Sequence, residues 1–90
     1  MKSYHEPIEV VTSDDGLPCR WRWRKSVWRV VRVLDHWVLQ SRWWTRATGA
    51  EKRTYLLVEA TPETRPEPYS CAVEIYLKGD GAWILARILH

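Results

Sequence analysis

Arginine and tryptophan alternate through RWRWRKSVWR, residues 20 to 29, and this stretch has the residue types best suited to bind nucleic acid. Guanidinium groups neutralise phosphates, and an exposed indole stacks on an unpaired base with roughly 1–3 kcal/mol. Strict alternation places the two residue types on opposite faces of a strand. We therefore predict a nucleic-acid contact formed by cationic side chains, namely Arg20, Arg22, Arg24, Lys25, Arg29 and Arg42.

The same alternation also fits a sheet that needs a core on one side and water on the other. In that interpretation Trp21, Trp23 and Trp28 are core residues and the arginines form their solvated outer face. Buried indoles cannot stack on bases, so the contact then falls to the adjacent pair Trp43 and Trp44, of which one points outward on a strand. Both interpretations stay open at the level of sequence.

A second class of function is protein interaction. A sheet edge, or a groove lined by Trp43, Trp44 and Tyr55, would accept a partner strand or peptide, with arginine at its rim. Homodimerisation through the same surface is a variant of this hypothesis. Binding to phosphates weakens steeply with salt, whereas an apolar docking surface is nearly insensitive to it, and this difference separates the two classes.

Catalytic patterns are weak throughout the chain. The three histidines are scattered, the serines lie in no nucleophile motif, and Asp14-Asp15 belongs to a turn. The segment KGDG at residues 78–81 is a hairpin connection, too short for a phosphate loop. Cys19 and Cys71 have no metal-ligand spacing, and we expect both to be buried free thiols. The prediction is a protein with no enzymatic activity, no cofactor and no metal.

Length and composition indicate one small domain over residues 1–90. The chain has 46% hydrophobic residues, a formal net charge of +3, and seven tryptophans with no phenylalanine. A basic balance permits a polyanionic partner without requiring one. No apolar run approaches the roughly 20 residues of a membrane span, and the start lacks the apolar core of a leader peptide. We expect a cytoplasmic protein with no membrane contact.

The element pattern predicts a mainly β fold. Strands are expected at residues 7–12, from 19 to the turn at Lys25-Ser26, from there to about 40 with a bend near 35–36, and at 54–60, 69–77 and 82–89. That turn would place Trp23 opposite Trp28, with Val31 and Val33 on the face of Arg29. The proline-rich segment 61–68 is expected to be a loop. About six antiparallel strands in a meander would form a small barrel or a strongly curved sheet. At most one short helix is expected, with residues 33–42 as the candidate.

The segments EPIEV, RWRKSVWRVVRVLDHW, RWWTR, RTYLLVEA and EIYLKGDGAWILARIL resemble a small bacterial domain of unknown function that occurs as a short stand-alone protein in actinobacteria and in Deinococcus and Thermus relatives. The double tryptophan, the tyrosine-containing strand and the final tryptophan-containing strand also resemble the C-terminal end of ImuB-type proteins, catalytically degenerate relatives of Y-family DNA polymerases. This resemblance implies an accessory role near DNA damage tolerance. The partners it implies are DNA, single-stranded or damaged, and a polymerase or a RecA-like repair protein.

Overall fold

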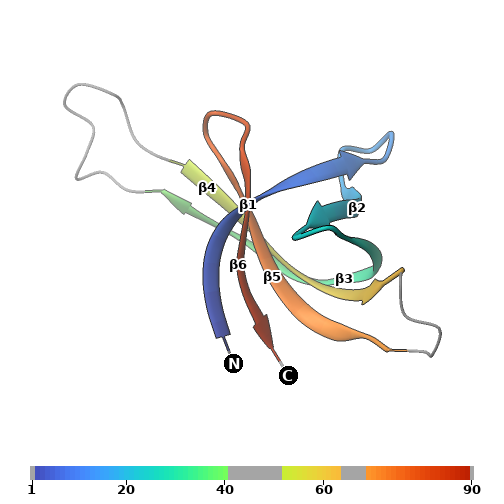
Figure 1. The fold of residues 1–90 in the computed structure, drawn as a ribbon. Coiled ribbons are helices and arrows are strands. Elements are labelled where there is room, and N and C mark those ends of the chain that lie inside the picture. Colours follow the sequence, from blue (N-terminus) through green and yellow to red (C-terminus); the bar gives the residue numbers. More distant parts are fainter. Residues whose placement is uncertain (1, 41–51, 64–68, 90) are drawn as a thin grey trace.

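Six strands and no helix make up the computed structural model, which describes residues 2–40, 52–63 and 69–89. Each strand pairs antiparallel with the next along the chain, and the last pairs with the first, so the sheet closes into a barrel (Figure 1). The prediction of a six-stranded antiparallel barrel is confirmed. Within the described ranges no helix is long and apolar enough to span a membrane. The strands are β1 (Lys2–Thr12), β2 (Pro18–Trp23), β3 (Ser26–Gln40), β4 (Lys52–Pro62), β5 (Cys71–Lys78) and β6 (Trp83–Leu89).

The core fills the barrel with alternate residues of each strand. Val58 and Ala60 of β4 face Val73 and Ile75 of β5, and all four are fully buried. Trp21 and Trp28 complete the same cluster from β2 and β3, together with Ile8, Leu56, Leu85 and Ile88. The period of two in the sequence therefore sorts apolar side chains to the inside of the barrel.

The turn between β2 and β3 lies one residue earlier than the sequence predicts. Arg24 and Lys25 occupy it, both with positive φ (50° and 65°), which is typical of a two-residue hairpin turn. Consequently Trp21 pairs with Trp28 and Arg20 with Arg29, so the predicted pairing of Trp23 with Trp28 is wrong. Moving the register by two residues leaves the paired side chains of the hairpin, residues 20–23 and 27–29, on their predicted faces, because the side-chain period is also two.

Two bulges in β3 change which residues face the core. The register with β4 shifts between Val30 and Arg32 and again between Val33 and Asp35. The first shift turns Arg32 outward, opposite Glu59, and turns Val33 inward, opposite Val58. The prediction that Val33 shares the face of Arg29 is therefore wrong, and the irregularity predicted near residues 35–36 begins earlier in the strand.

Three segments differ from the predicted secondary structure: the start of β1, the end of β4 and the second half of β3. β1 begins at Lys2, well before the predicted start at residue 7, and its pairing with β6 shifts between Ser3 and Glu6. The predicted loop 61–68 is wrong for its first two residues, since Thr61 and Pro62 end β4. The remainder of that segment from residue 64 lies outside the described residues. For the helix candidate 33–42, the described part up to Gln40 is strand.

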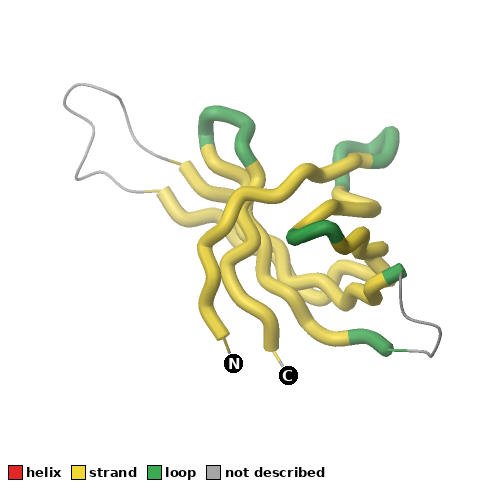
Figure 2. The backbone as a smooth tube through the Cα atoms, viewed as in Figure 1, coloured by secondary structure: helices red, strands yellow, loops and turns green. Residues whose placement is uncertain are grey.

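β3 extends far beyond the strand that precedes it. Only residues 26–29 pair with β2, whereas β4 pairs with β3 from Trp28 to Gln40. Figures 1 and 2 show the end of β3 and the start of β4 running out to one side of the barrel. Along residues 30–40, β3 therefore has a strand neighbour on one side only within the described part of the chain.

Candidate nucleic-acid interface

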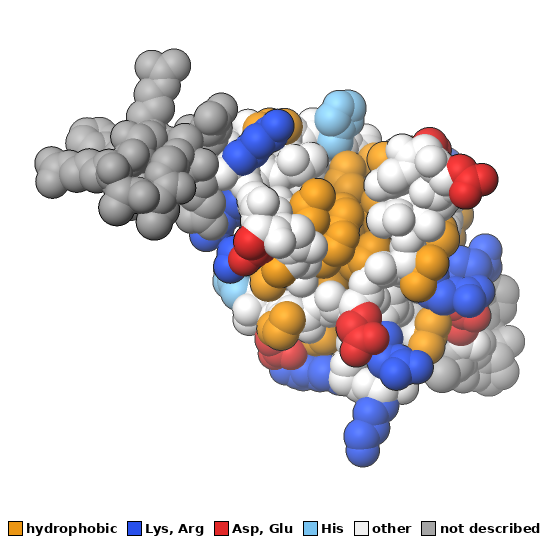
Figure 3. All heavy atoms as spheres, turned by 90° about the horizontal axis from the view of Figure 1, so that it is seen from above, with side chains coloured by type: hydrophobic (Ala, Val, Ile, Leu, Met, Phe, Trp, Pro, Cys, Tyr) orange, Lys and Arg blue, Asp and Glu red, His pale blue; other side chains and the backbone are white. Residues whose placement is uncertain are grey.

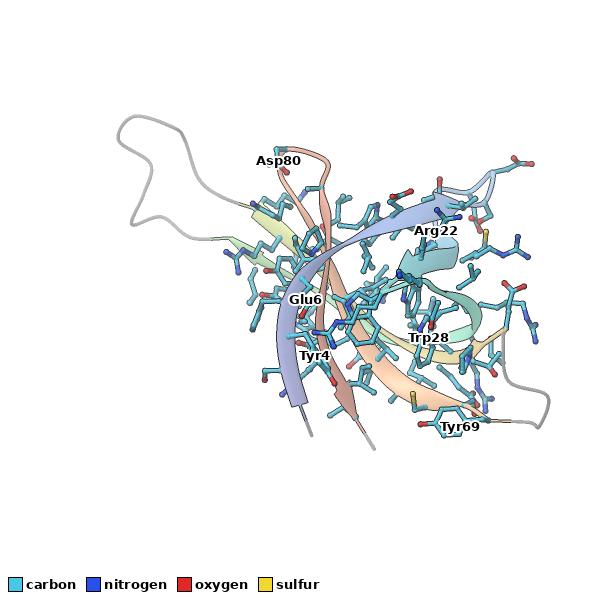
Figure 4. The ribbon with its side chains drawn as sticks, in the orientation of Figure 1. Tyr4, Glu6, Arg22, Trp28, Tyr69 and Asp80 are labelled. Carbon is cyan, nitrogen blue, oxygen red and sulfur yellow. The ribbon has the colours of Figure 1, made fainter. Side chains whose placement is uncertain are left out.

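Arginine side chains gather on the outer face of β2 and β3. Arg22 lies opposite Glu9 of β1, and Arg20 lies between Val11 of β1 and Arg29 of β3. A shallow depression of about 180 Å³ opens on this part of the barrel, lined by Glu9, Val11, Arg20, Trp21, Arg22 and Val27. Figure 4 places Arg22 on β2, at a distance from Tyr4 and Glu6 of β1. The hairpin thus brings three of the predicted arginines, Arg20, Arg22 and Arg29, together on one surface.

Two of the predicted cations already have carboxylate partners. The Nε of Arg20 lies 2.8 Å from Oε2 of Glu63, next to the end of β4. The guanidinium of Arg24 donates from Nε to Oε1 of Glu6 over 3.0 Å and pairs through its second nitrogen with Oε2. Glu6 also accepts a hydrogen bond of 2.9 Å from Nε1 of Trp23. The hydrogen bond from Arg24 is the main cause that lowers the pKa of the Glu6 carboxyl below its ordinary value of 4.5, and the hydrogen bond from Trp23 is the next.

Arg24 is further held by aromatic rings. Its guanidinium carbon lies 4.7 Å from the ring centroid of Trp23 and 5.2 Å from that of Tyr4. Tyr4 and Trp23 in turn meet edge to face at 4.9 Å. A guanidinium with a bidentate partner and two ring contacts is well fixed, so Arg24 mainly holds the turn onto β1.

Three predicted cations remain available to an anion. Arg22, Lys25 and Arg29 are exposed and form no ion pair with any other described residue. In the view from above (Figure 3), Lys and Arg side chains lie mainly around the border of a band of hydrophobic side chains. The sixth predicted cation, Arg42, lies outside the described residues.

The tryptophans of the alternating stretch belong to the core. Trp21 is 1% exposed and Trp28 is 8% exposed, and their rings stack at 6.0 Å with an angle of 8° between planes. Trp23 is half-buried and packs against the same cluster. The core interpretation is confirmed for Trp21 and Trp28, so these two rings cannot stack on a base. The alternative pair, Trp43 and Trp44, lies outside the described residues.

A row of aromatic rings crosses the outer face of β3, β4 and β5, and we call it the outer aromatic ladder (Trp37, Tyr55 and Tyr76). Trp37 stacks on Tyr55 at 5.4 Å with planes 4° apart, and Tyr55 meets Tyr76 at 4.9 Å. The guanidinium carbon of Arg53 lies 5.0 Å from the ring centroid of Tyr76, and the ring of His5 lies 6.2 Å from it. Tyr76 is buried, whereas Trp37 and Tyr55 are half-buried. Tyr55, predicted to bind a partner, is therefore the middle ring of this ladder.

Sequence reasoning missed Trp37, Tyr76 and Arg53 as members of a surface site. Simple alternation from Arg29 already assigns Trp37 to the outer face, since both are odd-numbered positions of one strand. The pairing of Trp37 with Tyr55, and of Tyr55 with Tyr76, depends on the register between three strands. Turns and bulges set that register, and their positions are difficult to predict from the sequence.

The two cysteines are free thiols in different environments. Cys19 is exposed and Cys71 is half-buried, so the expectation of buried thiols is wrong for Cys19, whose side chain points out of the barrel. Burial raises the pKa of the Cys71 thiol above its ordinary value of 9.0, against a smaller lowering by a hydrogen bond with Tyr69. Among the described residues no three His, Cys, Asp or Glu side chains form a group that would hold a metal ion.

A family model described as a domain of unknown function (DUF6504) matches residues 1–90, the full length of the chain. A search of curated proteins found no match. A search of solved structures found none either. The match to the family model carries no assigned activity, so the function has to be argued from the surface itself.

Proposed function

We propose that this chain, which belongs to the DUF6504 family of domains of unknown function, is a non-catalytic module that binds single-stranded nucleic acid along the outer face of β3. The proposal rests on one observation. Arg29, an exposed cation that forms no ion pair with a described residue, and Trp37, which stacks on Tyr55, both lie on the outer face of β3, near its start and near its end. Arg22 and Lys25 add two more such cations in the adjoining β2–β3 hairpin. Cations beside an aromatic stack are the combination that single-strand binders use.

The geometry suits a short single strand. Arg29 and Trp37 are separated by at most about 26 Å along the strand, at about 3.3 Å per residue. Single-strand sites on small barrels take about four nucleotides or more, which fits this length. Trp37 is the terminal ring of the outer aromatic ladder, so only one of its faces is covered by Tyr55. A base stacked on the other face would lengthen the ladder while Arg29, Arg22 and Lys25 neutralise phosphates.

The test is a salt titration of binding to a labelled oligothymidine and to a duplex of equal length, read by fluorescence anisotropy. We expect tighter binding to the single strand and a linear fall of log K with log salt concentration. Arg22→Ala with Arg29→Ala should reduce the slope by roughly 1.4, at about 0.7 for each lost phosphate contact. Lys78→Ala, which removes a cation paired with Asp80 at 3.9 Å, is the matched control and should leave the slope unchanged.

A second arm addresses the aromatic part of the site. Trp37→Leu should weaken single-strand binding by about 1–3 kcal/mol at constant salt slope, because stacking is lost and phosphate contacts are kept. Circular dichroism and the melting temperature establish that the variant is folded. Equal and weak binding by the wild type, the double arginine variant and Lys78→Ala would disprove the proposal.

We infer the cellular context, DNA damage tolerance, from the resemblance of this chain to the C-terminal end of ImuB-type proteins. Affinity capture from cells before and after DNA damage tests that context, with a translesion polymerase or a RecA-like protein as the expected partner. Enrichment of neither after damage would remove the context and leave the nucleic-acid proposal to the binding assay.

A further inference from the structure

Within the part of the chain that the structure describes, the C-terminal half of β3 has a free backbone edge. β2 ends its pairing with β3 at Arg29, and among the described residues no Cα of β1, β5 or β6 lies within 8 Å of a Cα of β3. The N–H and C=O groups that point away from β4 along residues 30–40 therefore have no strand neighbour in the described part of the chain. Such an edge is a template for one more strand.

The edge pairs regularly with β4 over its last six residues and lacks charged residues and proline over its last five. Both bulges lie before Asp35, so residues 35–40 pair with β4 one to one. From His36 to Gln40 there is no proline, lysine, arginine, aspartate or glutamate, the residues that keep free edges from pairing. Val38 is 51% exposed and Leu39 is 53% exposed, and they lie on opposite faces of this segment.

The apolar side chains of the molecule concentrate on the same strand. Of the six large hydrophobic residues exposed in the described part of the chain, four belong to β3: Val31, Leu34, Val38 and Leu39. Scattered exposed hydrophobic residues need no explanation, but a series along one unpaired edge indicates a docking surface. An added strand would bury Val38 and Leu39 between its own alternate side chains.

The charges beside this edge indicate which kind of strand would bind to it. Arg29 lies on β3 before the free segment, and Lys52 and Arg53 lie on β4 across from its end. Asp35 is the single carboxylate of β3, and Arg32 is already paired with Glu59. A second copy would bring these cations against their own counterparts, and each chain already carries a formal net charge of +3. A strand with acidic residues at both ends is complementary instead.

We propose that residues 35–40 of β3 accept an extended segment of a partner protein in which apolar residues alternate with aspartate or glutamate. Main-chain hydrogen bonds to the edge supply affinity, and the apolar positions of the segment pack against Val38 and Leu39. This site uses the main-chain edge of β3 with Val38 and Leu39, whereas the nucleic-acid proposal uses Arg22, Arg29 and the ring of Trp37, so substitutions at different residues test the two proposals.

The experiment uses the full chain and two labelled synthetic peptides of about eight residues. One alternates valine with glutamate and the other alternates valine with lysine. We expect the glutamate peptide to bind at least about tenfold more tightly than the lysine peptide. Leu39→Glu should weaken its binding by about tenfold or more, whereas Leu17→Glu, at a leucine 45% exposed in the β1–β2 turn, should not change it.

Amide hydrogen exchange separates strand addition from side-chain docking. New protection on peptide binding should fall on amides of residues 35–40. Equal affinity for both peptides, equal effects of Leu39→Glu and Leu17→Glu, or protection confined to other strands would each overturn the proposal. So would a concentration-dependent dimer, seen by sedimentation without peptide and abolished by Leu39→Glu, since a second copy would then occupy the edge. Oligonucleotide binding fails or succeeds separately, through Arg22 and Arg29.

Discussion

Trp21 of β2 and Trp28 of β3 form a stacked pair of rings within the core cluster. Their Nε1 atoms are buried and have no hydrogen-bond partner in the described structure. An unpaired buried N–H costs about 1–3 kcal/mol, whereas each indole removes a large apolar area from water. The net effect favours burial, which explains why a chain without phenylalanine can still fill its core.

Two substitutions of Trp21 separate the cost of the unpaired N–H from the stabilisation gained by burying the ring. Trp21→Ala should reduce the free energy of unfolding by about 3–5 kcal/mol, because it leaves a cavity beside Trp28. Trp21→Phe keeps an aromatic ring and removes the unpaired N–H, so its cost should be clearly smaller. Urea unfolding followed by circular dichroism measures both. Equal losses for the two variants would mean that the indole N–H finds a partner, contrary to the structure.

The two thiols should differ in reactivity. Cys71 is half-buried and its pKa is raised by burial, so less thiolate forms at a given pH than for an exposed thiol. Limited treatment with iodoacetamide near neutral pH should alkylate Cys19 first, as read by peptide mass spectrometry. Preferential modification of Cys71 would show that β5 or its surroundings open more readily than the barrel predicts.

Glu6 links stability to pH. Hydrogen bonds from Arg24 and then Trp23 lower its pKa, so its stabilising contribution is complete above the unfolded value, about 4.5, and is lost as pH falls through the lower folded value. Glu6→Gln should be less stable than the wild type at neutral pH, with the difference shrinking on acidification below about pH 4.5. Thermal melts across pH measure this. Glu9→Gln, on the same strand without an ion pair to a described residue, is the control, and a pH-independent difference for Glu6→Gln would contradict the linkage.

At the scale of the element, the β2–β3 turn carries conformational strain. Arg24 and Lys25 both adopt positive φ, which costs a non-glycine residue about 1–2 kcal/mol. Arg24 is compensated by Glu6, Trp23 and Tyr4, whereas Lys25 is exposed and has no partner among the described side chains. The contacts of Arg24 therefore hold the turn in place, whereas no side-chain contact among the described residues offsets the strain at Lys25.

Lys25→Gly should relieve that strain. We expect a gain of about 0.5–1 kcal/mol in the free energy of unfolding, since glycine reaches positive φ freely but loses more entropy on folding. Chemical denaturation measures the gain. Lys25→Ala retains a Cβ and should bring no such gain, so equal stabilisation by both variants would assign the effect to the lost charge.

The two bulges of β3 keep its charged residues on the outside of the barrel while Val33 faces the core. Without them strict alternation would direct Arg32 toward the core, whereas the first bulge turns it toward Glu59 at 2.5 Å and Val33 inward. Donation from Arg32, followed by that from Ser70, lowers the pKa of Glu59. The second bulge then keeps Asp35 on the outside, opposite Leu57.

At the scale of the whole molecule, protection by neighbouring strands is uneven. β4 and β5 pair on both sides and hold Val58, Ala60, Val73 and Ile75, all fully buried, while β3 beyond Arg29 pairs on one side in the described structure. Native-state hydrogen exchange should therefore be slowest in the middle of β4 and β5 and faster in residues 35–40. Uniform protection along β3 would mean that something covers its edge in solution.

The amino-acid sequence was sufficient to predict the class of fold and, where the strands are regular, which side chains face the inside of the barrel. Period-two alternation around Trp21 and through Val73 and Ile75 predicts strands with an apolar inner face, and glycine and proline positions divide them into a meander. This works because alternation is local and holds whatever the pairing partner. The interpretation of Trp21 and Trp28 as core residues, one of the two that the sequence left open, follows from this alternation and agrees with their burial.

Contacts between residues of different strands could be identified only from the folded barrel. The turn at Arg24-Lys25, the pairing of Arg20 with Glu63 and the outer aromatic ladder depend on strand register, and the free edge of β3 depends on the short length of β2. Register is a cooperative outcome of turns, bulges and barrel closure, and residues far apart in the chain contribute to it. A local pattern can therefore place a side chain inside or outside the barrel, but its neighbour is chosen by the closed sheet.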